Sequence, residues 1–160
     1  LNKVYTHPGD VFFIPAGTVH AVGAGNLLCE VQQSSNSTYR LYDYDRKDKY
    51  GNLRKLQLSK ALDVLDYGKY HPHEFNTETT TSGTVVGRCR FFEVIVFEVR
   101  DRVEFNIDNS HFASILCLTG EGEIEARDIK SEIVVGDSFF VQAGERITVT
   151  GKVKILVSWI

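Results

Sequence analysis

One pattern of fourteen residues occurs twice in the chain and constrains its fold more than any other feature. GDVFFIPAGTVHAV occupies residues 9–22, and GDSFFVQAGERITV occupies residues 136–149, with no gap between the aligned copies. In each copy a Gly-Asp turn leads into an apolar strand and an Ala-Gly turn leads out of it. An offset of 127 residues is too long for a solenoid repeat and favours two similar domains in tandem. The copies differ where His20 of the first is replaced by Ile147 of the second.

The spacing of apolar residues predicts a mainly β chain. Between residues 85 and 160, about eight short runs of aromatic and β-branched residues are separated by Gly, Asn or Asp turns. This number of strands is typical of a small jelly roll or closed barrel, and no room is left for the helices of a doubly wound fold. The same pattern predicts strands at residues 11–15, 18–23 and 26–33.

One short helix is predicted in the segment LSKALDVLDYG. Leu58, Leu62 and Leu65 recur there at helical spacing. Ser59 is a suitable N-cap, and Gly68 lies past the expected end.

A polar, Thr-rich stretch at residues 71–84 separates the two parts of the chain and predicts a linker. We therefore expect one domain at residues 1–70 and another at residues 85–160. The linker begins with His71-Pro72-His73-Glu74, which suggests a second metal cluster. A proline between the histidines, at the start of a polar segment, favours a solvated loop instead.

The composition of the chain argues against some classes of partner and indicates its compartment. A net charge of −3 argues against nucleic acid or an anionic membrane as the main partner. No apolar run approaches the length of about 20 residues that spans a bilayer, and no signal peptide is apparent. Three cysteines, odd in number and beside apolar runs, indicate buried, reduced thiols in a cytoplasmic protein. The chain contains no methionine, so we expect a fragment or a processed product.

The order of Gly9, Pro15, Gly17 and His20 resembles the second sequence motif of the cupin superfamily. In cupins that histidine points into the barrel and binds a metal. A lone histidine is more often a core residue with a satisfied hydrogen bond, but the surrounding motif favours a metal ligand at His20. The apolar Ile147 in the second copy indicates a barrel without metal.

A closer resemblance extends from residue 9 to about residue 67, through CEVQQSSNSTYRLYDYDRKDKYGNLRKLQLSKALDVLDY. This stretch resembles the Firmicutes-type branch of the type I mannose-6-phosphate isomerases, which are zinc-dependent enzymes of the cytoplasm with two cupin domains. Members are about twice as long as this chain, which corresponds to their C-terminal half. The resemblance therefore implies that residues 1–70 are the C-terminal part of the catalytic cupin domain. Residues 85–160 are then a metal-free, cupin-like barrel.

The resemblance also implies roles for individual residues. His20 matches one of the family's four zinc ligands, and the other three match nothing in this chain. Arg40, in the TYRLYDY motif, matches an arginine of the sugar-phosphate pocket and is the expected catalytic and substrate-binding residue. Asn36 stands where the family has an acidic residue, and we assign it, with Tyr42, to substrate binding. Asp43 has a smaller chance of shaping the same pocket.

These residue types suit the isomerisation of an aldose to a ketose. The reaction moves a proton between C1 and C2 through an enediolate, whose charge a metal and an arginine stabilise. No general base is apparent in the chain. Glu30 and Gln32 share a strand face that points either toward His20 or toward solvent, and alternation alone does not decide between them.

Two functions follow from the sequence. The first is mannose-6-phosphate isomerase, with a sugar phosphate as substrate, zinc as cofactor and no activity in this chain alone. The alternative is a non-catalytic cupin module that binds a metal or sugar or assembles with a partner. Because about four strands of the first barrel are present where a barrel needs roughly eight, we also expect self-association through open strand edges.

Overall fold

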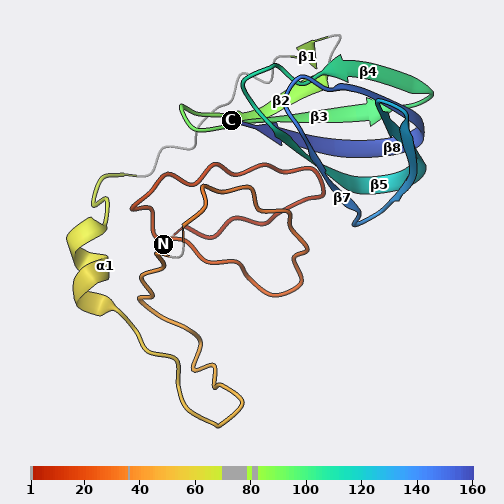
Figure 1. Ribbon diagram of the computed structural model, residues 1–160. Coiled ribbons are helices and arrows are strands. Elements are labelled where there is room, and N and C mark those ends of the chain that lie inside the picture. The colour runs from red at the N-terminus through yellow and green to blue at the C-terminus, as the bar shows by residue number, and fades with distance from the viewer. Residues whose placement is uncertain (1, 36, 70–78, 81–82) are drawn as a thin grey trace. The chain divides into compact units, whose positions relative to one another are not determined.

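The computed structural model describes residues 2–35, 37–69, 79–80 and 83–160. The chain divides into two compact units, Leu1–His73 and Glu74–Ile160 (Figure 1). Most of the predicted linker lies outside the described residues, as do Asn36 and the His71-Pro72-His73-Glu74 segment.

The second unit is an antiparallel β-sheet, which confirms the prediction of a mainly β chain. Its strands are β1 (Thr79–Thr80), β2 (Gly83–Arg88), β3 (Glu93–Val99), β4 (Arg102–Asn106), β5 (Ala113–Ala126), β6 (Ile129–Val134), β7 (Ser138–Val141) and β8 (Arg146–Trp159). They hydrogen-bond in the order β1-β2-β3-β8-β5-β6, while β4 also pairs with β8 and β7 also pairs with β5 (Figure 1).

The two longest strands, β5 and β8, pair with each other and each has two further neighbours. The first half of β8 pairs with β4 and its second half with β3, whereas β5 pairs first with β7 and then with β6. The halves of these strands therefore belong to two layers. Phe97 on β3 and Phe105 on β4 both lie in the core, and their rings stack with centroids 4.7 Å apart.

Glycines allow β5 and β8 to change layers without ending. Gly120 has a φ of +83° and Gly151 a φ of +108°, both in the region that side chains disfavour. A Cβ on Gly120 would lie 2.0 Å from the carbonyl oxygen of Lys152, so no other residue fits this approach. The sequence pattern predicts a strand break at each of these glycines, but the strands continue through them. The described residues 83–160 consequently form seven strands, β2 to β8, rather than about eight.

The core of the second unit is built from apolar side chains of both layers. Ile147, the counterpart of His20, has an exposed fraction of 0% there. Of the three cysteines only Cys117 is buried, whereas Cys89 is partly exposed and Cys29 is exposed. The prediction that all three are buried is therefore wrong.

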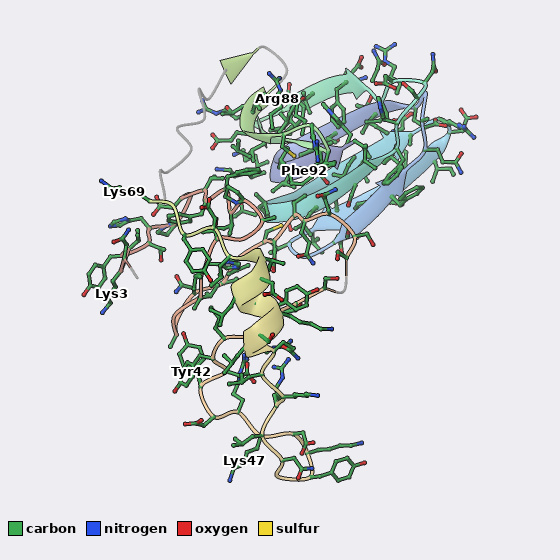
Figure 2. The ribbon with its side chains drawn as sticks, turned by 90° about the vertical axis from the view of Figure 1, so that its left-hand side faces the viewer. Lys3, Tyr42, Lys47, Lys69, Arg88 and Phe92 are labelled. Carbon is green, nitrogen blue, oxygen red and sulfur yellow. The ribbon has the colours of Figure 1, made fainter. Side chains whose placement is uncertain are left out.

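The first unit differs from its predicted secondary structure. No strand is assigned among its described residues, although the sequence pattern predicts three. A strand needs a hydrogen-bonded neighbour, and this part of the chain supplies only an isolated bridge between Lys47, labelled in Figure 2, and Leu53. Large apolar side chains consequently remain exposed, among them Val11, Phe12, Ile14, Val19, Leu27 and Leu28.

The predicted helix is present as α1 (Leu58–Val64). Its N-cap is Gln57 rather than Ser59, which lies inside the helix, and no side chain caps it. Ala61 is the buried residue of α1, whereas Leu58 and Leu62, two of the leucines at helical spacing, are about half exposed. Neither this seven-residue helix nor any other in the described part of the chain has the length and apolar character that a membrane crossing requires.

Candidate functional site

The turn before His20 rests on the C-terminal end of α1. The amide of Thr18 donates to the carbonyl of Pro15 at 3.2 Å, and Gly17 has a φ of +87°. The amide of Asp66 donates to the carbonyl of Gly17 at 3.0 Å. A Cβ on Gly17 would lie 2.8 Å from the carbonyl oxygen of Val64. Both the backbone conformation and the close approach therefore require glycine at this position.

His20 follows this turn with an exposed imidazole. Its Nδ1 atom lies 2.9 Å from the carbonyl oxygen of Thr18. A carbonyl oxygen only accepts hydrogen bonds, so Nδ1 is the donor in this contact and Nε2 is the nitrogen that a metal would use. Metal-binding histidines use the same arrangement, with one nitrogen donating to a carbonyl and the other facing the metal.

The described residues do not form a zinc site by themselves. A catalytic zinc takes about three protein ligands, and no group of three or more His, Cys, Asp or Glu in the described ranges is placed to hold a metal. Glu30 and Gln32 are both exposed. His20 therefore supplies one suitable donor, which does not complete a zinc site among the described residues.

The two sequence copies begin with the same hydrogen-bonded turn. In the first, the amide of Asp10 donates to the carbonyl of His7 at 3.1 Å, and the carboxylate of Asp10 accepts from the amide of His7 at 2.8 Å. In the second, Asp137 and Val134 make the same pair of contacts at 3.0 and 2.9 Å. The two copies therefore share their opening turn, whereas only the second continues into strands, β7 and β8.

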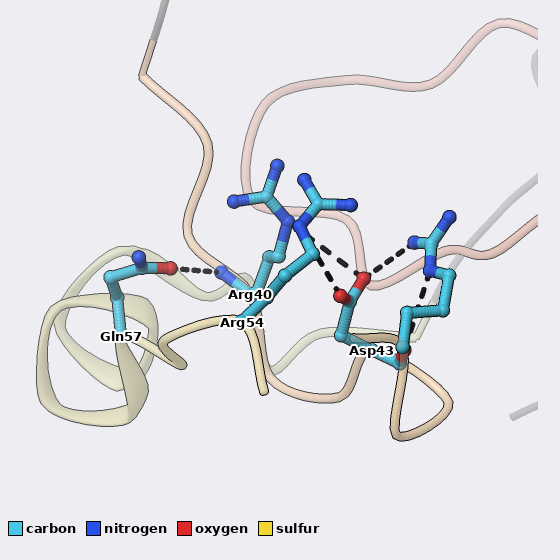
Figure 3. Close-up of polar contacts among 5 residues, drawn as sticks. Arg40, Asp43, Arg54 and Gln57 are labelled. Carbon is cyan, nitrogen blue, oxygen red and sulfur yellow. Dashed lines mark hydrogen bonds and ion pairs between the residues drawn. The ribbon is translucent and has the colours of Figure 1, made fainter. Parts of the chain in front are cut away.

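Three arginines surround the carboxylate of Asp43 (Figure 3). Nη2 of Arg46 lies 2.5 Å from Oδ1, Nε of Arg40 lies 3.9 Å from Oδ1, and Nε of Arg54 lies 3.3 Å from Oδ2. Asp43 is only 5% exposed, and its Oδ2 atom accepts no hydrogen bond among the described residues. Ion pairs rather than a complete set of hydrogen bonds therefore balance this buried charge.

Two antiparallel segments bring these residues together. The amide of Arg40 donates to Oε1 of Gln57, and the amide of Gln57 donates to the carbonyl of Arg40, both at 3.0 Å. Further along, the amide of Arg54 donates to the carbonyl of Arg46 at 3.4 Å. The carboxylate of Asp48 closes the far end by accepting backbone N–H groups of the turn beside it. Arg40 and Arg54 thus reach Asp43 from opposite segments.

A left-handed turn directs Asp43 toward the arginines. Tyr44 and Asp45 have φ values of 54° and 52°, and the amide of Arg46 donates to the carbonyl of Asp43 at 3.1 Å. This is the geometry of a type I′ turn, which ordinarily contains Asn-Gly. Neither Tyr44 nor Asp45 is glycine, so the turn holds two side chains in a conformation that most residues disfavour.

The sequence pattern predicts a role for Arg40 and a smaller one for Asp43, but gives no signal for Arg54 or Gln57. The stretch YDYDRKD is most simply a solvated loop, yet its Asp43 is buried. Arg54 and Gln57 carry no motif. The available signal is the spacing of Asp43, three residues from Arg40 and three from Arg46, which lets both arginines reach one carboxylate.

Tyr42, the other predicted substrate residue that the structure describes, takes no part in these ion pairs. Tyr42 is 62% exposed, and its ring packs at a tilt of 58° against Tyr44, with centroids 5.0 Å apart (Figure 2). Asn36 falls outside the described residues, so its assignment to substrate binding stays a prediction.

The two-layered antiparallel sheet with its repeated turn defines the cupin class of β folds. Residues 81–160 match the family model described as mannose-6-phosphate isomerase, cupin domain. The chain therefore belongs to the mannose-6-phosphate isomerase cupin-domain family.

Its relatives include the mannose-6-phosphate isomerase ManA of Bacillus subtilis, 34% identical over 148 residues that cover 90% of this chain and 46% of the relative. The mannose-6-phosphate isomerase of Streptococcus mutans is 35% identical over 127 residues, 78% of this chain and 40% of the relative. A crystal structure of the Bacillus subtilis mannose 6-phosphate isomerase superposes with a TM-score of 0.67 at 27% identity, covering 78% of this chain and 40% of that one. The chain thus spans about half the length of the curated relatives it matches.

Proposed function

We propose that the protein containing this chain interconverts mannose 6-phosphate and fructose 6-phosphate in the cytoplasm. The observation that carries this proposal is the guanidinium of Arg40, 30% exposed and paired with the buried carboxylate of Asp43. An arginine placed in this way binds an anionic substrate with charge-assisted hydrogen bonds. Relatives named as mannose-6-phosphate isomerases, at 34% and 35% identity, support the choice of reaction.

The reaction removes a proton from C2 of the aldose and returns a proton to C1, while the carbonyl moves from C1 to C2. Negative charge develops on the enediolate between these steps. In this proposal Arg40 binds the phosphate of the substrate and so holds C1 and C2 in a fixed position for the proton transfer. Zinc dependence is inferred from the resemblance alone. His20 offers one ligand, and the other ligands would come from residues other than the described ones.

Arg40→Ala should reduce isomerase activity of the natural gene product about 100-fold or more, because the substrate is no longer held in its reactive position. Arg40→Lys keeps the charge but not the planar fork and should recover only part of that loss. Near-normal turnover in Arg40→Ala would remove Arg40 from the mechanism.

The 160-residue chain alone should be inactive and should not retain zinc. One ligand does not hold a metal tightly, since affinity depends on several preorganised donors. Metal analysis after dialysis against a weak chelator tests this expectation. Stoichiometric zinc would contradict it and would indicate ligands beyond His20.

A non-catalytic cupin module is the second candidate, motivated by the lack of any group of three or more potential metal ligands among the described residues. The two functions are separated by assaying the natural gene product with added zinc. Binding of mannose 6-phosphate without turnover supports the module, and turnover supports the isomerase.

A further inference from the structure

Arg54 stands in the same relation to Asp43 as Arg40 does. Each points its Nε atom at the carboxylate, at 3.3 Å for Arg54 and 3.9 Å for Arg40. Figure 3 shows both guanidinium groups on the same side of Asp43, with their terminal nitrogens turned away from the carboxylate. The two side chains therefore present their Nη groups in one direction.

The charges of this cluster do not balance. Arg46 makes the closest contact to Asp43, since its Nη2 atom donates to Oδ1 at 2.5 Å and its Nε atom donates to the carbonyl of the same residue at 3.3 Å. Arg46 thus neutralises the carboxylate. Within the described ranges, no carboxylate other than Asp43 lies within 4.0 Å of a charged nitrogen of Arg40 or Arg54. Two positive charges are left in excess.

The guanidinium groups of Arg40 and Arg54, which carry these two charges, are partly exposed to solvent. The side chains of Arg40 and Arg54 are 30% and 40% exposed, and their Nη atoms have no hydrogen-bond partner among the described residues. A guanidinium offers its Nη groups as a rigid fork that matches phosphate oxygens. A phosphate monoester carries about −1.5 to −2 charges at pH 7, so one such group compensates both arginines.

We propose that Arg54 binds the phosphate group of the substrate together with Arg40, and that Asp43 positions both guanidinium groups. This inference rests on the proposed function for the identity of the substrate. It adds to that function a second phosphate-binding arginine and a positioning carboxylate, both assigned from the geometry around Asp43.

The first experiment measures the binding of inorganic phosphate to this chain by calorimetry at low salt. Arg54→Gln should weaken binding about 10- to 100-fold, the loss expected for charge-assisted hydrogen bonds. Lys55→Gln is the matched control, because it removes the same charge from the exposed neighbouring residue and should weaken binding less than about threefold. Arg54→Lys should be intermediate, and it keeps the test valid if Arg54→Gln fails to fold.

Equal losses in Arg54→Gln and Lys55→Gln would overturn the proposal, since the effect would then be one of general charge. No phosphate binding by the unmodified chain would overturn it as well.

The second experiment separates this inference from the proposed function. In the natural gene product, Arg54→Gln should raise KM for mannose 6-phosphate about tenfold or more and change kcat much less, because the phosphate is bound equally in ground and transition states. Isomerase activity with an unchanged KM in Arg54→Gln would sink the role of Arg54 and leave the function standing. Arg54-dependent phosphate binding without isomerase activity would support the role of Arg54 and contradict the proposed function.

Discussion

Nε of Arg54 lies 3.3 Å from Oδ2 of Asp43, a buried carboxylate oxygen that accepts no hydrogen bond among the described residues. Because this oxygen accepts no hydrogen bond, the buried charge depends on its ion pairs, and Asp43 and its three arginines form one group. Arg40 shares the same carboxylate at 3.9 Å. A substitution of Asp43 should therefore affect both segments that these ion pairs join.

Asp43→Asn should loosen the pairing of these segments. The substitution leaves three arginines without their counter-ion, and the amide of Gln57, which donates to the carbonyl of Arg40, should exchange its hydrogen about tenfold faster. Hydrogen exchange measured by NMR gives the rate at that amide. Asp45→Asn, at the exposed neighbouring aspartate, is the control and should leave the rate within about twofold. Equal protection in Asp43→Asn and the unmodified chain would show that the ion pairs do not hold the segments.

The part of the fold that depends on local sequence is predictable. The Gly-Asp and Ala-Gly turns occur in both copies because glycine and aspartate stabilise them locally, and the strand pattern of the second unit follows from alternating burial. The continuity of β5 and β8 is not predictable in the same way. Gly120 looks like a strand terminator, and only the approach of Lys152 shows that it is a bend.

The candidate site also has a part that the sequence predicts and a part that it does not. Arg40 belongs to a motif, whereas Arg54 reaches Asp43 through a turn that puts Tyr44 and Asp45 in the left-handed region. Tyrosine ordinarily avoids positive φ, and aspartate adopts it less often than glycine does. Neither residue type therefore predicts this turn. The three strands predicted for the first unit are not assigned among its described residues, for a related reason. A strand requires a hydrogen-bonded partner, and the alternation of apolar residues in one segment does not show whether a partner is present.

Residues 83–160 should fold alone and without zinc. Ile147 occupies the core position that corresponds to His20, so packing replaces any need for metal there. Ile147→Ala should lower the free energy of unfolding by about 2–5 kcal/mol, and the control Ile147→Val by about 0.5–1.5 kcal/mol. Urea unfolding followed by fluorescence of the single tryptophan, Trp159, measures both. A disordered circular dichroism spectrum for residues 83–160, or unfolding on addition of a chelator, would contradict this expectation.

Asp108 should make the second unit sensitive to acid. A hydrogen bond with His111 at 2.7 Å, followed by the hydroxyl and amide of Ser110, holds the pKa of this carboxyl well below its ordinary value of 3.8. A carboxyl with a depressed folded pKa contributes stability above its unfolded pKa and loses it as the pH falls through the folded pKa. The contribution should therefore decline progressively below about pH 4.

Urea midpoints for the unmodified chain and Asp108→Asn, measured from pH 6 to pH 2, should differ at the upper end and converge at the lower end. Asp128→Asn removes another exposed carboxyl of the same unit and serves as the control. If both variants show the same dependence on pH, the contacts with His111 and Ser110 have no particular effect.

The chain alone should self-associate through its first unit. Val11, Phe12 and Leu28 are 53%, 49% and 52% exposed, and no strand is assigned in the described residues of this unit. Exposed apolar surface favours burial, and unpaired strand-forming backbone favours pairing with a second copy. Light scattering after size-exclusion chromatography should therefore give a dimer at low micromolar concentration, and Phe12→Lys combined with Leu28→Lys should give a monomer. Phe140→Lys, at a 69% exposed phenylalanine of the second unit, is the control and should leave the dimer intact. A clean monomer of the unmodified chain would contradict the prediction, and a dimer lost only in Phe140→Lys would move the interface to the second unit.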